Sequence, residues 1–117
     1  MSQTSIDSKA FIAGEDLEAY RRVKLSTNSG TQVEYADAGE AFIGITAAKA
    51  AAGERVSVDL KSTARTFKVV AAGVINVGVN IYGAIDGQVS ATVSGAIIGK
   101  ALEAAGSAQE VIESLFI

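Results

Sequence analysis

The stretch AGVINVGVNIYGAIDGQVS, residues 72–90, decides the fold class. It carries one acid and no base, it is rich in glycine, and its aliphatic residues often lie two positions apart. Apolar side chains that alternate with period two are typical of β-strands, and Asp-Gly between two such runs is a strong hairpin signal. The stretch therefore predicts a pair of central strands joined at Asp86-Gly87, with one face in the core and the other facing a partner subunit.

The same patterns continue over the rest of the chain. Because the sequence has 12 glycines and no proline, its turns must use Gly, Asn, Asp and Ser. Turns are predicted at residues 27–30, 37–40, 52–55 and 85–88. Strands are predicted where apolar residues alternate or β-forming residues gather, at residues 22–26, 56–61, 66–70 and 77–82. The alanine-rich residues 47–52 are compatible with a turn of helix.

The two halves of the chain resemble each other. At a spacing of 55 residues, Phe42-Ile43-Gly44 matches Ile97-Ile98-Gly99, Val56 matches Val111, and Leu60 matches Leu115; further upstream, Ala13-Gly14 echoes Ala72-Gly73. This pattern indicates an internal duplication. By periodicity alone the tail, residues 102–116, fits a helix about as well as a strand. The duplication favours a strand over 110–115, since the matching residues 54–60 alternate clearly.

We therefore expect a mainly β fold: one small β-barrel or β-sandwich-like domain over residues 13–117, made of two similar units, after an extended N-terminal arm of residues 1–12. The arm has too little apolar surface to fold alone, so a partner must order it. Its apolar side chains can bury area on that partner, and its polar residues can pair along an exposed strand edge. The expected partner-binding residues are Gln3, Thr4, Ser5, Ile6, Phe11 and Ile12.

Composition excludes several classes of function. There is no cysteine and no histidine, so disulfides, thiolate metal sites, imidazole bases and histidine-ligated metals are impossible. The carboxylate pairs lie in turn-like contexts, and no recognisable catalytic motif is present. We expect no enzyme activity, no metal and no cofactor.

Charge and hydropathy limit the partners as well. A net charge of −3 argues against nucleic-acid binding, and the short basic cluster Arg21, Arg22, Lys24 is interpreted as a solvated strand edge or loop. The uncharged run from 69 to 85 is too short and too rich in Asn and Gly for a membrane helix. The N-terminal residues lack the features of a secretory signal, so synthesis in the cytoplasm is expected.

Two segments are similar to known sites. Residues 95–100, GAIIGK, have too few residues between the glycines for a phosphate-binding loop, and Ala101 stands where Ser or Thr is needed. A duplicated small β fold is also similar to lipoyl- and biotin-carrying domains, in which the modified lysine sits on an exposed hairpin. Lys100 would be that lysine, but its neighbours Gly99 and Ala101 differ from the methionine-flanked motif of that family.

From Gly14 to Ile117 the sequence resembles the small β-rich capsid cement, or head decoration, proteins of bacteriophages. The shared segments, in order, are Ala13-Gly14-Glu15-Asp16-Leu17, Val23-Lys24-Leu25, Phe42-Ile43-Gly44-Ile45-Thr46, Ala52-Gly53-Glu54-Arg55-Val56-Ser57-Val58, residues 81–89 (IYGAIDGQV), residues 98–104 (IGKALEA) and Glu110-Val111-Ile112. Gly78 departs from the pattern and leaves the start of the following strand open.

This resemblance implies a structural virion protein on the exterior of an icosahedral phage head, made in the host cytoplasm. Its implied partners are the major capsid protein, whose subunits it bridges, and copies of itself in a homotrimer. A phage tail or host-surface adhesion module is the nearest alternative, and a lipoyl- or biotinyl-type carrier is a more distant one.

Overall fold

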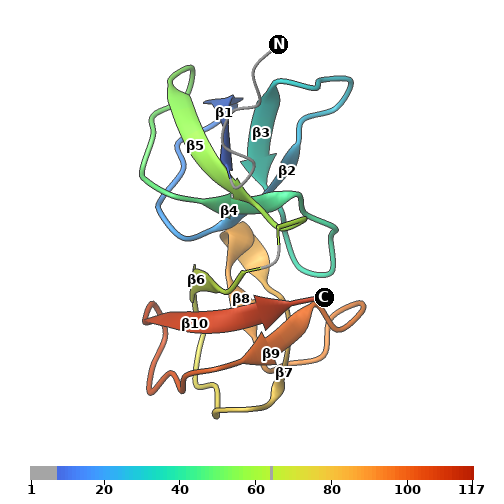
Figure 1. Cartoon of the computed structure of the whole chain (residues 1–117), viewed down its shortest axis with the longest axis vertical. Helices are drawn as coiled ribbons and strands as arrows, with labels where there is room; N and C mark the ends of the chain where they lie inside the picture. The colour runs from blue at the N-terminus through green and yellow to red at the C-terminus, as the bar shows by residue number, and fades with distance from the viewer. Residues whose placement is uncertain (1–7, 64) are drawn as a thin grey trace.

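The computed structural model describes residues 8–63 and 65–117, and these residues form a nearly all-β structure with no α-helix among them (Figure 1). The strands are β1 (Ser8–Ala13), β2 (Arg22–Leu25), β3 (Gln32–Tyr35), β4 (Gly44–Thr46), β5 (Arg55–Leu60), β6 (Phe67–Val70), β7 (Asn80–Gly83), β8 (Val89–Ser90), β9 (Gly99–Ala101) and β10 (Val111–Phe116). A single 3-10 turn, η1 (Ile85–Gly87), lies between β7 and β8. The expected mainly β fold class is confirmed.

The first five strands close into a barrel in the order β1-β3-β2-β4-β5. β5 shows why its sequence forms a strand here: Val56 and Val58 point into the barrel and are buried, while Arg55 and Ser57 between them are exposed. Strand alternation of this kind places one apolar face in the core. The barrel core comes entirely from this part of the chain and comprises Phe11, Ala13, Leu17, Val23, Val33, Ala50, Val56 and Val58.

The last five strands form a sheet in the order β6-β10-β9-β7-β8. This sheet curls toward closure, because an isolated parallel bridge joins Ala71 to Val89 across its two edges. The barrel is closed in the same place by parallel pairing of β1 with β3, where Ala13 lies opposite Val33. The two sheets therefore share one topology.

The pairing registers establish the internal duplication. Phe11 pairs with Val56 as Val69 pairs with Ile112, and Val23 pairs with Gly44 as Ile81 pairs with Gly99. The isolated bridge from Leu17 to Ala50 recurs as the bridge from Ile75 to Ala105. We call residues 8–61 the first repeat and residues 66–117 the second repeat. The first repeat closes on itself as a barrel and the second curls toward closure, whereas the sequence predicted one barrel or sandwich made of both units.

The sequence match over the last strand is wrong by one residue. Val56 is equivalent to the buried Ile112, not to Val111, and Leu60 is equivalent to Phe116, not to Leu115. The reason is that the connection from β9 to β10 has one residue more than the connection from β4 to β5. Because a one-residue shift moves every strand side chain to the opposite face, Val111 and Leu115 lie outside the core.

The predicted turns are confirmed, and each contains a backbone with positive φ. Asn28 has φ 58°, Gly39 74°, Gly53 86° and Asp86 55°. The predicted strand over 110–115 is also confirmed as β10. The expected turn of helix at 47–52 is not formed; Ala50 there makes the isolated bridge to Leu17 instead.

The central position expected for the stretch 72–90 is wrong. Its strands β7 and β8 do form a hairpin around Asp86-Gly87, but β8 is an edge strand. The first strand starts at Asn80 and not at Val77, because Gly78 adopts a turn conformation with φ 81° immediately before it. Val77 is consequently 63% exposed.

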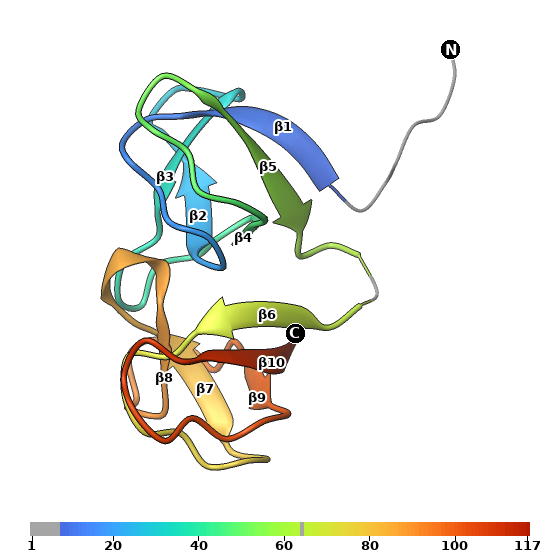
Figure 2. The same cartoon turned by 90° about the vertical axis from the view of Figure 1, so that its left-hand side faces the viewer.

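The two repeats stack along the long axis of the molecule, with the first repeat above the second in both views (Figures 1 and 2). A short connection from β5 to β6 joins them. The core of the second repeat also includes Ala36, Phe42 and Ile45, which belong to the first repeat. Phe42 reaches the ring of Phe116 in an edge-to-face contact, with 5.1 Å between the ring centroids.

The N-terminal boundary also differs from the expectation, since β1 takes in residues 8–12, which the sequence assigns to the arm. These residues pair with β5 from Ser8 opposite Asp59 to Ile12 opposite Arg55. The division into an arm of residues 1–12 and one domain of residues 13–117 otherwise stays a prediction.

Candidate interaction surfaces

Arg22 lies at the junction of the two repeats and is completely buried. The sequence-based interpretation of this residue as part of a solvated edge is therefore wrong. Its guanidinium donates hydrogen bonds to backbone carbonyl oxygens of both repeats: Nη2 to Ala36 at 2.9 Å and to Ala84 at 2.6 Å, and Nε to Gln88 at 2.9 Å. These hydrogen bonds to converging carbonyl groups offset the desolvation cost of burying the charged guanidinium.

The electrostatics of this junction follow from burial. Desolvation lowers the pKa of Arg22 to about 10, and the nearby carboxylates of Asp37 and Glu40 oppose this shift. The side chain therefore remains charged at neutral pH. Two glycines allow close packing here: a Cβ atom on Gly83 would lie 2.7 Å from Nη1 of the Arg22 side chain, and a Cβ on Gly87 would lie 2.5 Å from the Arg22 backbone carbonyl oxygen. The junction is thus a tightly fitted connection between the repeats and not a ligand site.

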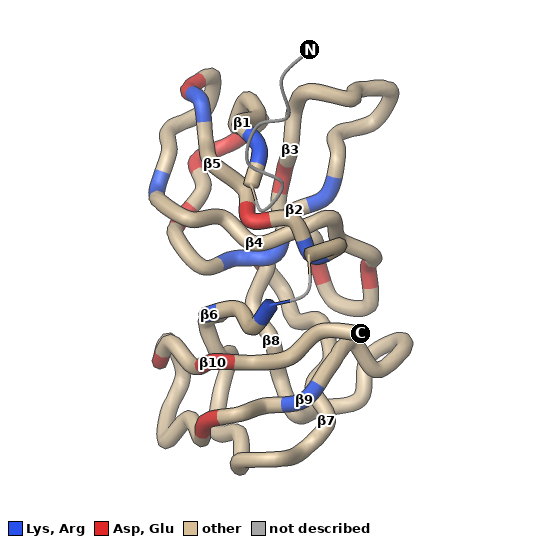
Figure 3. Tube along the Cα trace, in the orientation of Figure 1, with Lys and Arg blue, Asp and Glu red and all other residues tan. Residues whose placement is uncertain are grey.

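The outer surfaces of the two repeats differ sharply. The first repeat carries 15 charged residues and the second carries 6, and the coloured trace shows this concentration of charge on the upper unit (Figure 3). Exposed large apolar side chains show the reverse distribution. The first repeat has two, Tyr20 and Leu25, and the second repeat has nine: Val74, Val77, Ile85, Val93, Ile97, Leu102, Val111, Leu115 and Ile117. The second repeat is therefore the better candidate for contact with an apolar partner.

A nearly apolar hollow of about 410 Å³ lies on the outer face of β9 and β10. We call it the C-terminal groove; it is lined by Asn80, Ile97, Gly99, Lys100, Leu115 and Ile117. Leu115 is 42% exposed and Ile117 is 81% exposed. Its two polar side chains are joined by a hydrogen bond, which Lys100 Nζ donates to Asn80 Oδ1 at 3.1 Å.

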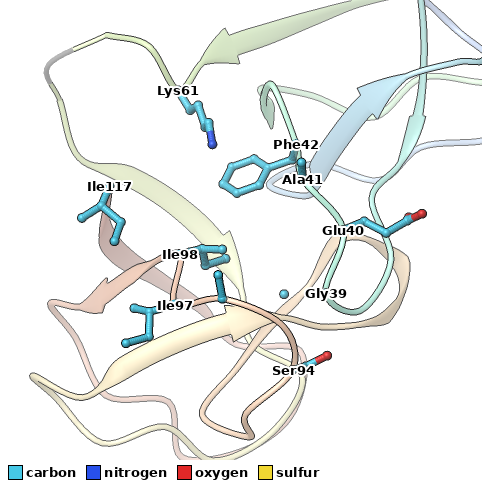
Figure 4. A pocket seen from close by; sticks show the side chains of 11 residues that line it. Gly39, Glu40, Ala41, Phe42, Lys61, Ser94, Ile97, Ile98 and Ile117 are labelled. Atoms are coloured by element: carbon cyan, nitrogen blue, oxygen red, sulfur yellow. The ribbon is translucent and has the colours of Figure 1, made fainter.

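A second hollow, of about 240 Å³, borders the C-terminal groove and lies between the repeats (Figure 4). The first repeat contributes Phe42 and Lys61, and the Lys61 ammonium lies 4.6 Å from the centroid of the Phe42 ring. The second repeat contributes Ile98 and also Ile97 and Ile117, which line both hollows. The apolar surface thus runs continuously from the outer face of β10 to the junction.

The structure separates the predicted partner-binding residues. Gln3, Thr4, Ser5 and Ile6 lie outside the described residues. Phe11 is only 6% exposed and fills the barrel core, so its ring is not on the surface. Ile12 is half-buried on the outer side of β1. Partner binding by these residues stays a prediction.

Lys100, the candidate lysine of the carrier interpretation, lies in the middle of β9. It is flanked by β7 and β10, where it pairs with Asn80 and Leu115. A lysine that is modified by another enzyme sits on an exposed hairpin in the carrier domains, and this position is a strand interior.

Within residues 8–63 and 65–117, no three Asp or Glu side chains come together in a way that could hold a metal ion. Those same ranges contain no helix of the length and hydropathy needed to span a membrane.

Sequence reasoning missed both the buried arginine and the C-terminal groove. Arg22 reads as one more charge beside Arg21 and Lys24, and no local pattern marks it as buried. The groove was hidden by the one-residue error in the repeat, which placed Val111 and Leu115 at core positions. The structure gives the correct spacing, since Gln109 with φ 73° corresponds to Gly53, but a glutamine does not signal this positive φ in the sequence.

Comparison with known proteins fits this architecture. No curated protein matches the sequence. Among solved structures, the chain is similar to the N base of the head fiber gp8.5 of bacteriophage phi29, with a TM-score of 0.81 and 20% sequence identity over 94% of this chain and 92% of that one. At this identity the similarity shows a shared fold. The model of a protein family described as phage cement protein matches residues 10–115, so the chain belongs to the phage cement protein family and is a structural, capsid-associated phage protein.

Proposed function

We propose that this protein binds the outer surface of an icosahedral phage head as a homotrimer and stabilises the shell by bridging neighbouring major capsid protein subunits. The observation that carries the proposal is the family match, which covers both repeats from residue 10 to residue 115. The protein is made in the host cytoplasm in this proposal and joins the head from outside.

Two features of the molecule support a bridging role. The buried Arg22 ties loops of both repeats together through its carbonyl contacts, so the two repeats can transmit force as one body. The two repeats also offer unlike surfaces, one rich in charge and one rich in exposed apolar side chains. A clamp between different subunits needs more than one contact surface.

The arm supplies one of the capsid contacts in this proposal. Strand β1 begins at Ser8, and the seven residues before it can reach up to about 23 Å when extended, at ~3.3 Å per residue. Gln3, Thr4 and Ser5 would pair along an exposed strand edge of a capsid subunit, and Ile6 would bury its side chain there. Ile12 would extend this contact at the point where the arm enters the barrel.

The test is binding of purified protein to undecorated heads, measured by co-sedimentation. Deletion of residues 1–7 should weaken binding at least tenfold and leave the thermal midpoint of the free protein unchanged, because the deletion stops before β1. The matched control replaces residues 2–7 by alternating Gly and Ser, which keeps the length and removes the side chains. Binding by both variants with full affinity would remove the arm from the mechanism.

Two further measurements separate the alternatives. Cryo-electron microscopy of the particle should show the protein over the junctions between capsid subunits, and density on the tail would contradict the proposal. Intact-mass analysis of protein from its native host should show the unmodified mass. A lipoyl or biotinyl adduct on Lys100 would instead establish the carrier function.

A further inference from the structure

We infer that the C-terminal groove is the surface through which copies of this chain assemble with each other. The inference deepens the proposed function, since it names the surface that would hold the homotrimer together. The internal duplication allows a comparison of the same face of the same fold in the two repeats. This face is covered in one repeat and open in the other.

In the first repeat this face is covered. Arg22 pairs with Ile45 on the outer side of β2 and β4, and both side chains are buried by the second repeat, together with Phe42. The same-chain interface therefore shows what this face of the fold accommodates: another β unit of the same fold.

In the second repeat the equivalent face is open. Asn80 and Lys100 pair on the outer side of β7 and β9 as Arg22 and Ile45 do, and Ile97 takes the place of Phe42. These three residues line the C-terminal groove. The groove is thus the free counterpart of an interface that is already occupied once within the chain.

The side chains around the groove have changed in the direction that self-association needs. Asp59 and Lys61 of the first repeat correspond to Leu115 and Ile117 of the second, so an acid and a base are replaced by two large apolar residues. The remaining polar pair, Lys100 and Asn80, is already joined by a hydrogen bond. Covering the groove therefore leaves the Lys100–Asn80 contact intact.

A second copy of this chain fits the groove better than a capsid subunit does. Interfaces that persist for the life of an oligomer are more apolar than interfaces between proteins that fold separately and meet later. The groove is nearly all apolar, whereas the charged exterior of the first repeat is suited to a later, polar encounter. A unit of this fold also covers the equivalent face within the chain.

The test exchanges residues between equivalent positions of the repeats. The double variant Leu115→Asp and Ile117→Lys gives the groove the residues that the first repeat has at these positions. Light scattering coupled to size-exclusion chromatography should show an oligomer for the wild type and a monomer for the variant, with a dissociation constant raised at least 100-fold. The milder variant Leu115→Ser should weaken assembly to an intermediate extent.

The matched control is Val77→Asp, which places an acid at an apolar position of the second repeat that is 63% exposed and does not line the groove. This variant should remain oligomeric.

Circular dichroism distinguishes loss of assembly from loss of folding, since all three variants should keep the β spectrum of the wild type. A monomeric wild type at tens of micromolar, or a double variant that still assembles, would overturn the inference. The proposed function is tested separately by head binding. A wild-type oligomer that does not bind heads would contradict the function and leave the inference standing. A monomer that uses the groove to bind heads would contradict the inference and support head binding.

Discussion

The two repeats of this protein share their strand order and pairing registers, yet they differ in nearly everything that faces outward. The first repeat has a complete core of its own and a charged exterior. The second repeat completes its core with Ala36, Phe42 and Ile45 of the first and, among the described residues, carries nine of the eleven exposed large apolar side chains. The inward-facing positions of a β unit therefore maintain its fold, while the outward-facing positions are free to form contacts with partners.

The largest expected effect comes from the contact that joins the repeats. Arg22→Ala removes the guanidinium donors from the carbonyl groups of Ala36, Ala84 and Gln88. The Ala36 and Gln88 carbonyls keep a backbone N–H donor, from Gly87 and Ala84, while the Ala84 carbonyl loses its donor. Loss of these charge-assisted hydrogen bonds, together with the cavity left by the side chain, should lower the free energy of unfolding by about 3 to 5 kcal/mol. Urea unfolding monitored by circular dichroism measures this change.

The equivalent residue of the second repeat provides the control for this experiment. Asn80 is half-buried and its side chain accepts a hydrogen bond from the exposed Lys100 ammonium, so Asn80→Ala should cost less than about 1 kcal/mol. If the two substitutions destabilise the protein equally, the junction contributes no special stability, and the asymmetry between the repeats loses its structural basis.

A smaller effect is expected from an exchange inside the two cores. Val58 and Ser114 occupy equivalent, fully buried positions, and among the described residues the Ser114 hydroxyl is one of the buried polar groups without a hydrogen-bond partner. Val58→Ser should destabilise the protein by about 2 to 4 kcal/mol through a cavity and a buried hydroxyl. Ser114→Ala should stabilise it by about 1 kcal/mol because it removes an unpaired polar group. Thermal unfolding of both variants tests the pair, and destabilisation by Ser114→Ala would show that the hydroxyl has a partner in solution.

The smallest effect concerns an ion pair that only the first repeat has. Lys24 Nζ lies 2.8 Å from Glu40 Oε2, and the second repeat has the uncharged Tyr82 at the position equivalent to Lys24. The hydrogen bond from Lys24, followed by that from the Asp37 backbone, lowers the pKa of Glu40, and the same pair raises the pKa of Lys24. The stabilisation from Glu40 is therefore present above its ordinary pKa of 4.5 and disappears as the pH falls through the lowered value. For Lys24 it is present below 10.5 and is lost as the pH rises through the raised value.

The measurement is the thermal midpoint as a function of pH. The difference between the wild type and Glu40→Gln should be small, constant between about pH 5 and 10, and should vanish in acid. Lys24→Gln should give the same difference near neutral pH, and the double variant should add nothing to it. A difference that persists in acid would assign the effect to the shape of the side chain and not to its charge.

Much of the fold could be predicted from local patterns. Asp86-Gly87 gave the hairpin, alternation in 55–60 gave β5, and the repeated Ile-Gly motif led to the duplication and thereby to β10. These signals work because they depend on backbone conformation and strand periodicity, which neighbouring residues determine.

Features that depend on contacts between distant residues could not be predicted in this way. Arg22 is buried only because the loops that contain Ala36, Ala84 and Gln88 converge on it, and nothing near residue 22 signals this convergence. The edge position of β8 likewise depends on which strands pair, and not on its own composition. The candidate interaction surface was missed because the connection before β10 contains one extra residue that the sequence match did not detect. This error reversed the prediction of which side chains of β10 face outward.

The uneven sharing of the two cores has a consequence for how the chain is made. The ribosome completes the first repeat before the second, and proteins generally begin to fold from the N-terminal part during synthesis. The barrel and its core need no residue beyond Leu60, so the barrel can close while the rest is still being translated. The core of the second repeat includes Phe42 and Ile45 of the first repeat. The second repeat can therefore pack against a surface of the first repeat that has already formed. The direction of translation thus agrees with the direction in which one half depends on the other.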